Sequence, residues 1–87
     1  MSEHDLESDW GGIKQNLSQR VREIRREFYG ENGGPMLAAD LEIPFRSWVR
    51  YESGASMPAP VLLRFLELTG ANPNWLLTGQ GPKYRSS

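Results

Sequence analysis

The sequence contains no cysteine, a single histidine and no long hydrophobic run. The absence of cysteine excludes disulfides and thiolate zinc sites, and it favours a reducing, intracellular setting. The longest apolar runs are only a few residues, as in "PVLL" and "WLL", so no membrane span is expected. The acidic start, "MSEHDLESD", lacks the basic and apolar segments of a signal peptide. We therefore expect a cytoplasmic protein with no membrane partner.

Residues that would support catalysis or cofactor binding are also scarce. His4 is the only histidine and lies near the N-terminus, so neither a metal site nor histidine-based catalysis has support. The glycine-rich stretch "GENGGP" lacks a following Lys–Ser/Thr pair and a preceding strand, so it is not a phosphate-binding loop. No Ser–His–Asp arrangement is credible. We expect no enzymatic activity, no cofactor and no metal.

The charge of the chain is unevenly distributed. The net charge of −1 arises from ten Lys/Arg and eleven Asp/Glu, but four of the acids lie in the first nine residues. The rest of the chain carries ten basic against seven acidic residues, a net of +3. We expect residues 1–11 to form a disordered acidic tail; a tail that folds back onto a basic surface is the alternative. The 87 residues then provide one domain, residues 12–80, and a C-terminal tail, residues 81–87.

Helical spacing of apolar residues dominates the chain, and no strand or repeat is apparent. A first helix over residues 12–29 is predicted by apolar residues spaced four, four, three and four apart, namely Ile13, Leu17, Val21, Ile24 and Phe28. A second helix opens at Pro35 and stops at a tight turn of Glu42 and Ile43, because Pro44 disfavours a helical residue before it.

Three further helices complete the expected fold. The third begins at Pro44 and ends at Ser53–Gly54, and the fourth runs from Ala59–Pro60 to Gly70. The fifth is short, with Asn72 as its N-cap and Gly79 at its end. We therefore predict an all-α fold of five short helices around one core, with a helix–turn–helix unit at its centre.

A helical wheel at about 100° per residue sorts the side chains of the third helix into two sides. Trp48, Glu52, Phe45 and Val49 cluster on one side, whereas Arg46, Arg50 and Ser47 occupy the other. Trp48 is the expected core anchor. A carboxylate on the core side must be paired, because burying a lone charge is costly. Arg25, on the margin of the apolar face of the first helix, is the predicted partner of Glu52 in a structural ion pair.

This order of elements resembles the lambda-repressor-like helix-turn-helix family, the XRE or Cro and phage-repressor type. The resemblance rests on "LA" in a short helix, a three- to four-residue turn, a second short helix ending "YESG", and "GANPNWLLTGQG" near the end. It covers roughly Leu17 to Gly81. It implies a DNA-binding domain of a transcriptional regulator that usually acts as a homodimer, and it places the dimer surface around the fifth helix and the C-terminal tail.

The resemblance also implies which residues meet double-stranded DNA. The third helix would enter the major groove while the second crosses the backbone. Arginine can donate two hydrogen bonds to a guanine edge, and an apolar side chain can contact a thymine methyl. The backbone at the start of the second helix could hold a phosphate, and so could the loop after the third helix. The implied DNA-contacting residues are Pro44, Phe45, Arg46, Val49, Arg50, Gly34, Ser53 and Ser56.

The chain departs from the family pattern at four positions. Gly34 stands where the family usually has a DNA-contacting Gln, Glu42 where the turn usually has Gly, and Pro44 where a Ser or Thr caps the third helix; Trp48 occupies a slot that usually holds Ile or Val. The missing Gln at residue 34, the weak net charge and the apolar pair Phe45 and Val49 keep a second function open. In it the fold is a protein-interaction module with little or no DNA binding, and a protein partner replaces the nucleic acid.

Overall fold

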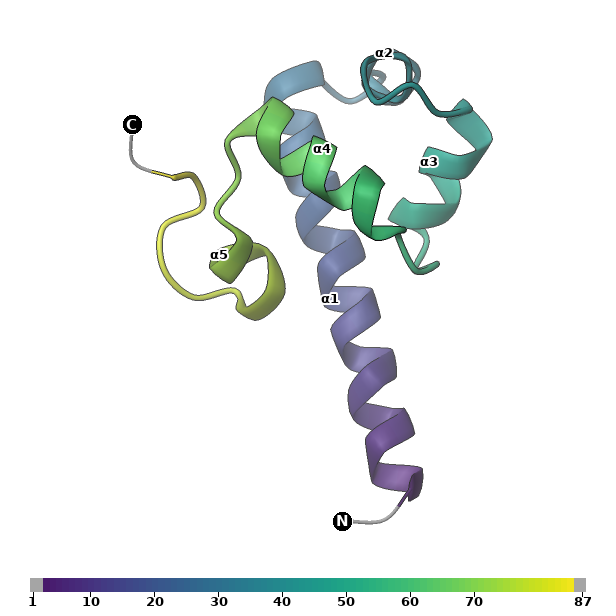
Figure 1. The fold of residues 1–87 in the computed structure, drawn as a ribbon, viewed down its shortest axis with the longest axis vertical. Helices are drawn as coiled ribbons and strands as arrows, with labels where there is room; N and C mark the ends of the chain where they lie inside the picture. Colours follow the sequence, from purple (N-terminus) through teal and green to yellow (C-terminus); the bar gives the residue numbers. More distant parts are fainter. Residues whose placement is uncertain (1–2, 86–87) are drawn as a thin grey trace.

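The computed structural model describes the backbone of residues 3–85 and the side chains of residues 16–85. Within this part the chain is all-helical, as predicted, and the only extended pairing is an isolated antiparallel bridge between Ala71 and Tyr84. Figure 1 shows α1 as a long rod, with the other helices gathered around its C-terminal half. The five helices are α1 (Glu3–Tyr29), α2 (Gly34–Asp40), α3 (Phe45–Glu52), α4 (Ala59–Thr69) and α5 (Pro73–Thr78).

The first helix begins earlier than the sequence predicted. It starts at Glu3 rather than near residue 12, so the segment predicted to be a disordered tail is helical from residue 3 onward. No proline precedes Pro35, and a glycine inside a helix costs only about 1 kcal/mol relative to alanine. Once a helix is formed, each added residue contributes one more hydrogen bond, so two adjacent glycines need not end it. The side chains of the acidic segment lie outside the described residues.

A core of apolar side chains forms where the helices meet. Trp48 is fully buried and stacks on Phe65, with ring centroids 5.5 Å apart, while Tyr51 meets it edge-on at 6.4 Å. The indole Nε1 of Trp48 has no hydrogen-bond partner among the described residues, so this side chain stabilises the fold through packing alone. The buried apolar residues are Val21, Ile24, Leu37, Ala38, Leu41, Trp48, Phe65, Ala71 and Leu76.

The turn between α2 and α3 is a Schellman motif. The N–H of Ile43 donates to the carbonyl of Ala38 and the N–H of Glu42 to that of Ala39, both at 3.0 Å. Glu42 is the single non-glycine residue with positive φ in the described chain, at 60°. Its carboxylate pairs with Arg64 of α4, which also donates to the carbonyl of Leu41. The turn therefore keeps the left-handed conformation that glycine usually supplies, and a side chain from α4 holds it.

Substitutions at Glu42 should reveal the cost of this conformation. We expect Glu42→Gly to be more stable than Glu42→Ala by about 1 kcal/mol, because both lose the pair with Arg64 but only alanine retains the left-handed strain. Chemical denaturation of the two variants measures the difference directly. Equal stabilities would mean that the turn relaxes to another conformation when the pair is removed.

The C-terminal segment is part of the domain, although the sequence analysis placed it in a tail. The N–H of Asn72 donates to the carbonyl of Lys83 and the N–H of Arg85 to that of Gly70, both at 2.8 Å. Lys83 binds the carboxylates of Glu23 and Glu27 on α1, at 3.0 and 2.6 Å. These contacts tie residues 82–85 to α1 and to the loop before α5.

Three aromatic side chains lie where this segment meets the helices. Phe28, predicted to face the core, is 53 % exposed and meets the ring of Tyr84 edge-on at 5.6 Å. Tyr84 is half-buried and donates its hydroxyl to Glu27 at 3.0 Å. Trp75 is also half-buried and lies under Lys83. Trp75 and Tyr84, which lie on α5 and in the C-terminal segment, are therefore only partly exposed.

The titration of Tyr84 should report the docking of the C-terminal segment. Burial, followed by the hydrogen bond to Glu27, raises the pKa of Tyr84 to about 12. Because the folded pKa lies above the unfolded value of about 10, its stabilisation is present below pH 10 and is lost as the pH rises toward 12. The tyrosinate absorbance of the wild type minus that of Tyr84→Phe isolates this residue. We expect this difference to titrate with a pKa near 12. A pKa near 10 for this group would contradict the docked segment.

Candidate functional site

The C-terminal end of α3 is held by polar side chains from α1. The Ser18 hydroxyl donates to the carbonyl of Tyr51 at 2.7 Å, and Arg22 donates to the carbonyl of Glu52, also at 2.7 Å. A helix leaves its last four carbonyls without partners inside the helix, and these two donors satisfy two of them. The orientation of α3 is therefore fixed by hydrogen bonds at its end as well as by Trp48 in the core.

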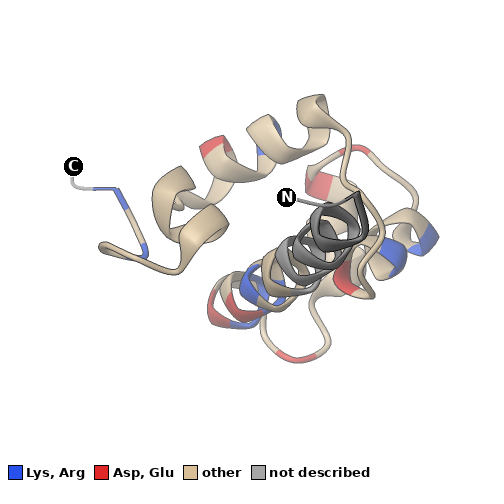
Figure 2. Ribbon diagram, turned by 90° about the horizontal axis from the view of Figure 1, so that it is seen from below, with Lys and Arg blue, Asp and Glu red and all other residues tan. Residues whose placement is uncertain are grey.

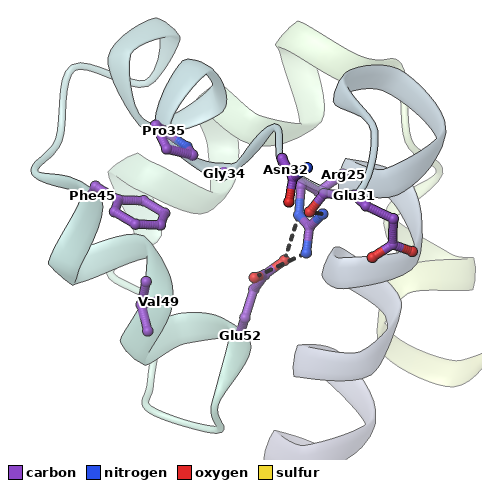
Figure 3. Close-up of a pocket in the computed structure, with 8 residues that line it drawn as sticks. All are labelled: Arg25, Glu31, Asn32, Gly34, Pro35, Phe45, Val49 and Glu52. Atoms are coloured by element: carbon purple, nitrogen blue, oxygen red, sulfur yellow. Dashed lines mark hydrogen bonds and ion pairs between the residues drawn. The ribbon is translucent and has the colours of Figure 1, made fainter.

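Arg25 completes this support and forms the ion pair that the sequence predicted. Its Nε lies 2.9 Å from Glu52 Oε1 and its Nη2 lies 3.3 Å from Glu52 Oε2, a two-point contact (Figure 3). The side chains are only 8 % and 14 % exposed. The remaining nitrogen, Nη1, donates to the carbonyls of Gly30 and Glu31, both at 2.8 Å. One guanidinium thus joins α1, the loop before α2 and the end of α3.

Ser18 and Arg22 were not identified as positioning residues from the sequence. The spacing of these polar residues along α1 could have indicated their role. Residues 18, 22 and 25 are four and three apart, so they lie along one face of α1. The signal is weak without knowing that the last turn of α3 packs on this face, because polar side chains at such spacing are common on solvated helices.

The outward side of α3 carries two exposed arginines. Arg46 and Arg50 are one turn apart, and neither forms an ion pair or a side-chain hydrogen bond with any residue whose side chain is described. Figure 2 shows the basic positions of α3 on the side of the molecule away from the C-terminal segment. The guanidinium donors of both residues are therefore available to a partner.

Phe45 and Val49 are also on the surface, so neither side chain belongs to the core. Phe45 is 47 % exposed and Val49 is 44 % exposed. Both lie on one side of α3, facing an open hollow of about 330 Å³ between α3 and the loop before α2 (Figure 3). Pro35 contributes to the opposite wall, and the Arg25–Glu52 pair closes one end. The helical wheel grouped these two residues with the core, but Trp48 is the buried residue that α3 contributes to it.

Gly34 is buried, so it is not available for the phosphate contact that the resemblance implied. A Cβ at this position would lie only 2.7 Å from Cε1 of Phe45, because the phenyl ring packs directly over the glycine. Pro35 follows and has no N–H to donate. The ring of Phe45 therefore occupies the space that a larger side chain at residue 34 would need.

The other predicted contact residues lie at the ends of α3. Pro44 is exposed and precedes the helix with φ −63° and ψ 144°, without a side-chain cap. Ser53 is exposed, but its hydroxyl donates to the carbonyl of Val49 at 2.8 Å, so its proton is already engaged. Ser56 is exposed in the loop before α4. The Ser56 hydroxyl, unlike that of Ser53, forms no hydrogen bond with any described residue of the chain.

The two glycines before α2 should respond differently to alanine. A Cβ on Gly33 would overlap the backbone carbonyl of Tyr29, which cannot move without distorting α1. A Cβ on Gly34 would meet only the ring of Phe45, which can rotate away. We expect Gly33→Ala to destabilise the fold by roughly 2–3 kcal/mol and Gly34→Ala by less than about 1 kcal/mol. Denaturant unfolding measures both, and a reversed order would contradict the packing of this loop.

The described residues contain no group of three or more metal-ligating side chains, and no helix among them is long and apolar enough to cross a membrane. No model of a known protein family matches the chain, and neither the curated proteins nor the solved structures yield a match.

Proposed function

We propose that the protein binds double-stranded DNA in a sequence-specific manner, with α3 in the major groove. The observation that carries this proposal is the pair of exposed, unengaged arginines, Arg46 and Arg50, on a helix that is anchored on its other side. Arginine donates bidentately to guanine O6 and N7, the commonest specific contact in this groove. An anchored helix holds the backbone from which both arginines project in a fixed orientation, which lowers the entropic cost of binding.

The arrangement of α2 and α3 supports a helix-turn-helix reading of the lambda-repressor-like type. The two helices are joined by the short left-handed turn at Glu42, and Trp48 packs α3 into the core. The motifs "YESG" and "NWLLTG" contribute the polar end of α3 and α5. In such proteins a homodimer places two such helices about one turn of DNA apart, at 10–10.5 base pairs. We propose the same use of this chain, as a transcriptional regulator.

A protein-interaction module is the alternative, and one observation favours it. Phe45 and Val49, 47 % and 44 % exposed, line one open hollow together with Pro35 at the start of α2. Large exposed apolar patches mark interaction sites in general, including those for other proteins. The arginines would then serve solubility or an acidic partner.

The dependence of affinity on salt separates the two functions. A protein that neutralises phosphates loses affinity with a log–log slope of about −0.9 per phosphate. We expect fluorescence anisotropy with labelled duplex DNA to show binding at low salt that weakens steeply as salt is added. The double variant Arg46→Ala/Arg50→Ala should bind more weakly. Absence of binding to duplex DNA even at low salt would reject the DNA function in favour of the protein-interaction module.

A further inference from the structure

The N-terminal half of α1 extends away from the other helices (Figure 1). The 27 residues of α1 span about 40 Å at 1.5 Å per residue, and the longest extent of the molecule is 41 Å. Among the residues whose side chains are described, the contacts of α1 with the rest of the domain come from its C-terminal half, for example from Leu17 and Ser18. Residues 3–15, the projecting half of α1, therefore lie beyond the part that the other helices surround.

An apolar stripe runs along the projecting half and into the core. Residues spaced four and three apart lie along one face of a helix. On this face Val21 and Ile24 are fully buried under the other helices, and Leu17 is half-buried at the boundary. The stripe thus continues for several turns past the part of α1 that the other helices cover. Its positions at and beyond the boundary are Leu6, Trp10, Ile13 and Leu17.

The projecting half of α1 needs a packing partner to remain helical. Gly11 and Gly12 lie within it, and each costs about 1 kcal/mol relative to alanine. Isolated helices shorter than about 12–15 residues are marginal in water, and helices in proteins gain most of their stability from packing an amphipathic face. The face that can supply this stability here is the apolar stripe.

The spacing of the stripe has the symmetry of two identical helices that run antiparallel. In a two-fold interface, residue i of one copy meets residue j of the other, and j meets i. The midpoint between residues 11 and 12 is equally far from Leu6 and Leu17, and equally far from Trp10 and Ile13. An antiparallel pair centred on that midpoint therefore sets position 6 level with position 17 of the second copy, and position 10 level with position 13.

The charges along α1 favour the same pairing. It sets residues 1–9 of one copy alongside residues 14–22 of the other. The first range carries four acidic residues and no Lys or Arg, whereas the second carries Lys14, Arg20 and Arg22 and no acidic residue. Arg20 and Arg22 donate to main-chain carbonyls and form no ion pair with any residue whose side chain is described. A parallel pair would instead set the four acidic residues of each copy side by side.

The position of the other helices also opposes a parallel pair. From Val21 onward the stripe of each copy is covered by the core of its own domain. Two parallel helices that shared the stripe would bring both domains to the same end and against the same face. In the antiparallel pair the two domains lie at opposite ends, and only the projecting halves and Leu17 share the contact.

We propose that the projecting half of α1 is a self-association surface, which pairs antiparallel with the same segment of a second copy of this chain. The inference goes beyond the proposed function, because the pairing needs no DNA and leaves the outward side of α3 free. It also differs from the resemblance, which implies a dimer surface around α5 and the C-terminal tail. The pairing covers the apolar stripe of both copies and places each acidic segment beside a basic one.

Sedimentation equilibrium of the 87-residue chain without DNA tests the association. We expect a species of twice 9.9 kDa, and we expect Trp10→Ala to raise its dissociation constant at least about tenfold, since buried tryptophans dominate many interfaces. Leu77→Ala is the matched control, because Leu77 is 52 % exposed on α5, and it should keep the wild-type dissociation constant. A monomer at concentrations on the order of 100 µM, or a Trp10→Ala chain that associates at least as tightly as Leu77→Ala, overturns the proposal.

Introduced cysteines test the orientation, because the chain has none of its own. In the antiparallel pair the two copies of position 6 lie about 16 Å apart along the helices, at 1.5 Å per residue. A disulfide needs Cα atoms within about 7 Å. We therefore expect Leu6→Cys and Leu17→Cys chains to form a mixed disulfide dimer under mild oxidation, whereas neither chain forms one with itself.

Mass spectrometry of the unreduced products separates the outcomes of the cysteine experiment. A disulfide dimer of Leu6→Cys alone indicates a parallel pair and overturns the proposal. The same conclusion follows if the mixed disulfide is absent although both variants are dimeric by sedimentation. Leu17 packs against the core, so thermal melting checks the fold of Leu17→Cys; the experiment with Leu6→Cys alone does not depend on that variant.

Discussion

Glu52→Ala is expected to destabilise the domain by about 3–5 kcal/mol, because it leaves the Arg25 guanidinium buried without its counter-charge. At roughly 0.05–0.15 kcal/mol per residue, a chain of 87 residues has a total stability of about 4–13 kcal/mol. The destabilisation by Glu52→Ala is therefore a large fraction of the free energy of unfolding. Thermal unfolding should show a melting temperature lower by at least about 12 °C.

A matched control separates burial from charge loss in this experiment. Arg26 and Glu31 form an ion pair at 3.1 Å with side chains 50 % and 73 % exposed. Glu31→Ala makes the same substitution at this exposed pair and should change stability by at most about 1 kcal/mol. If the two variants melt at similar temperatures, Arg25 and Glu52 do not pin α3 to α1 in the way the contacts suggest.

Arg46→Ala and Arg50→Ala should each weaken binding to the selected DNA site by about 1–3 kcal/mol, which is about 5- to 150-fold in affinity. The physical reason is the loss of a bidentate contact with a base, which also relaxes the preference at that position. Titration of each variant against the selected site and single-base variants of it measures both effects. Full affinity in both variants would place the recognition surface elsewhere.

Two further variants show what kind of contact is lost. Arg46→Lys and Arg50→Lys keep the charge but remove the planar fork, so they should lose specificity while keeping most of the salt dependence. Arg85→Ala provides a control of equal charge change on the C-terminal segment, whose end lies on the opposite side of the molecule from α3 (Figure 1). The backbone N–H of Arg85 still bonds to Gly70 in that variant, so the segment stays docked. Arg85→Ala should leave DNA affinity within a few-fold of the wild type.

The features of the fold that depend on local pattern were predictable. Apolar spacing and proline positions located α2 to α5 within a few residues, and the wheel of α3 identified Trp48 as the core anchor. The same wheel marked Glu52 as a carboxylate in need of a partner, and the predicted partner, Arg25, is its neighbour in space. These predictions succeed because helical periodicity and the free-energy cost of an unpaired buried charge can be applied to one helix without knowing the rest of the structure.

The features that depend on contacts between distant segments were not predictable. Phe45 packs on Gly34, eleven residues earlier, and the apolar spacing of α2 and α3 does not predict that contact. The left-handed turn at Glu42 is held by Arg64 from α4, and the C-terminal segment is held by Glu23 and Glu27 of α1. The resemblance leads one to expect glycine at residue 42, and the composition of residues 81–87 predicts a tail. Contacts with α4 and α1 explain why the structure differs from both expectations.

The most direct test of the central claim is the selection of bound sequences from random duplex DNA by the purified protein. DNA binding through α3 predicts an enriched motif that contains guanines spaced for Arg46 and Arg50. A dimer on a two-fold site predicts a repeat of that motif about 10 base pairs away. The contradicting result is that no motif is enriched and anisotropy detects no binding to duplex DNA even at low salt.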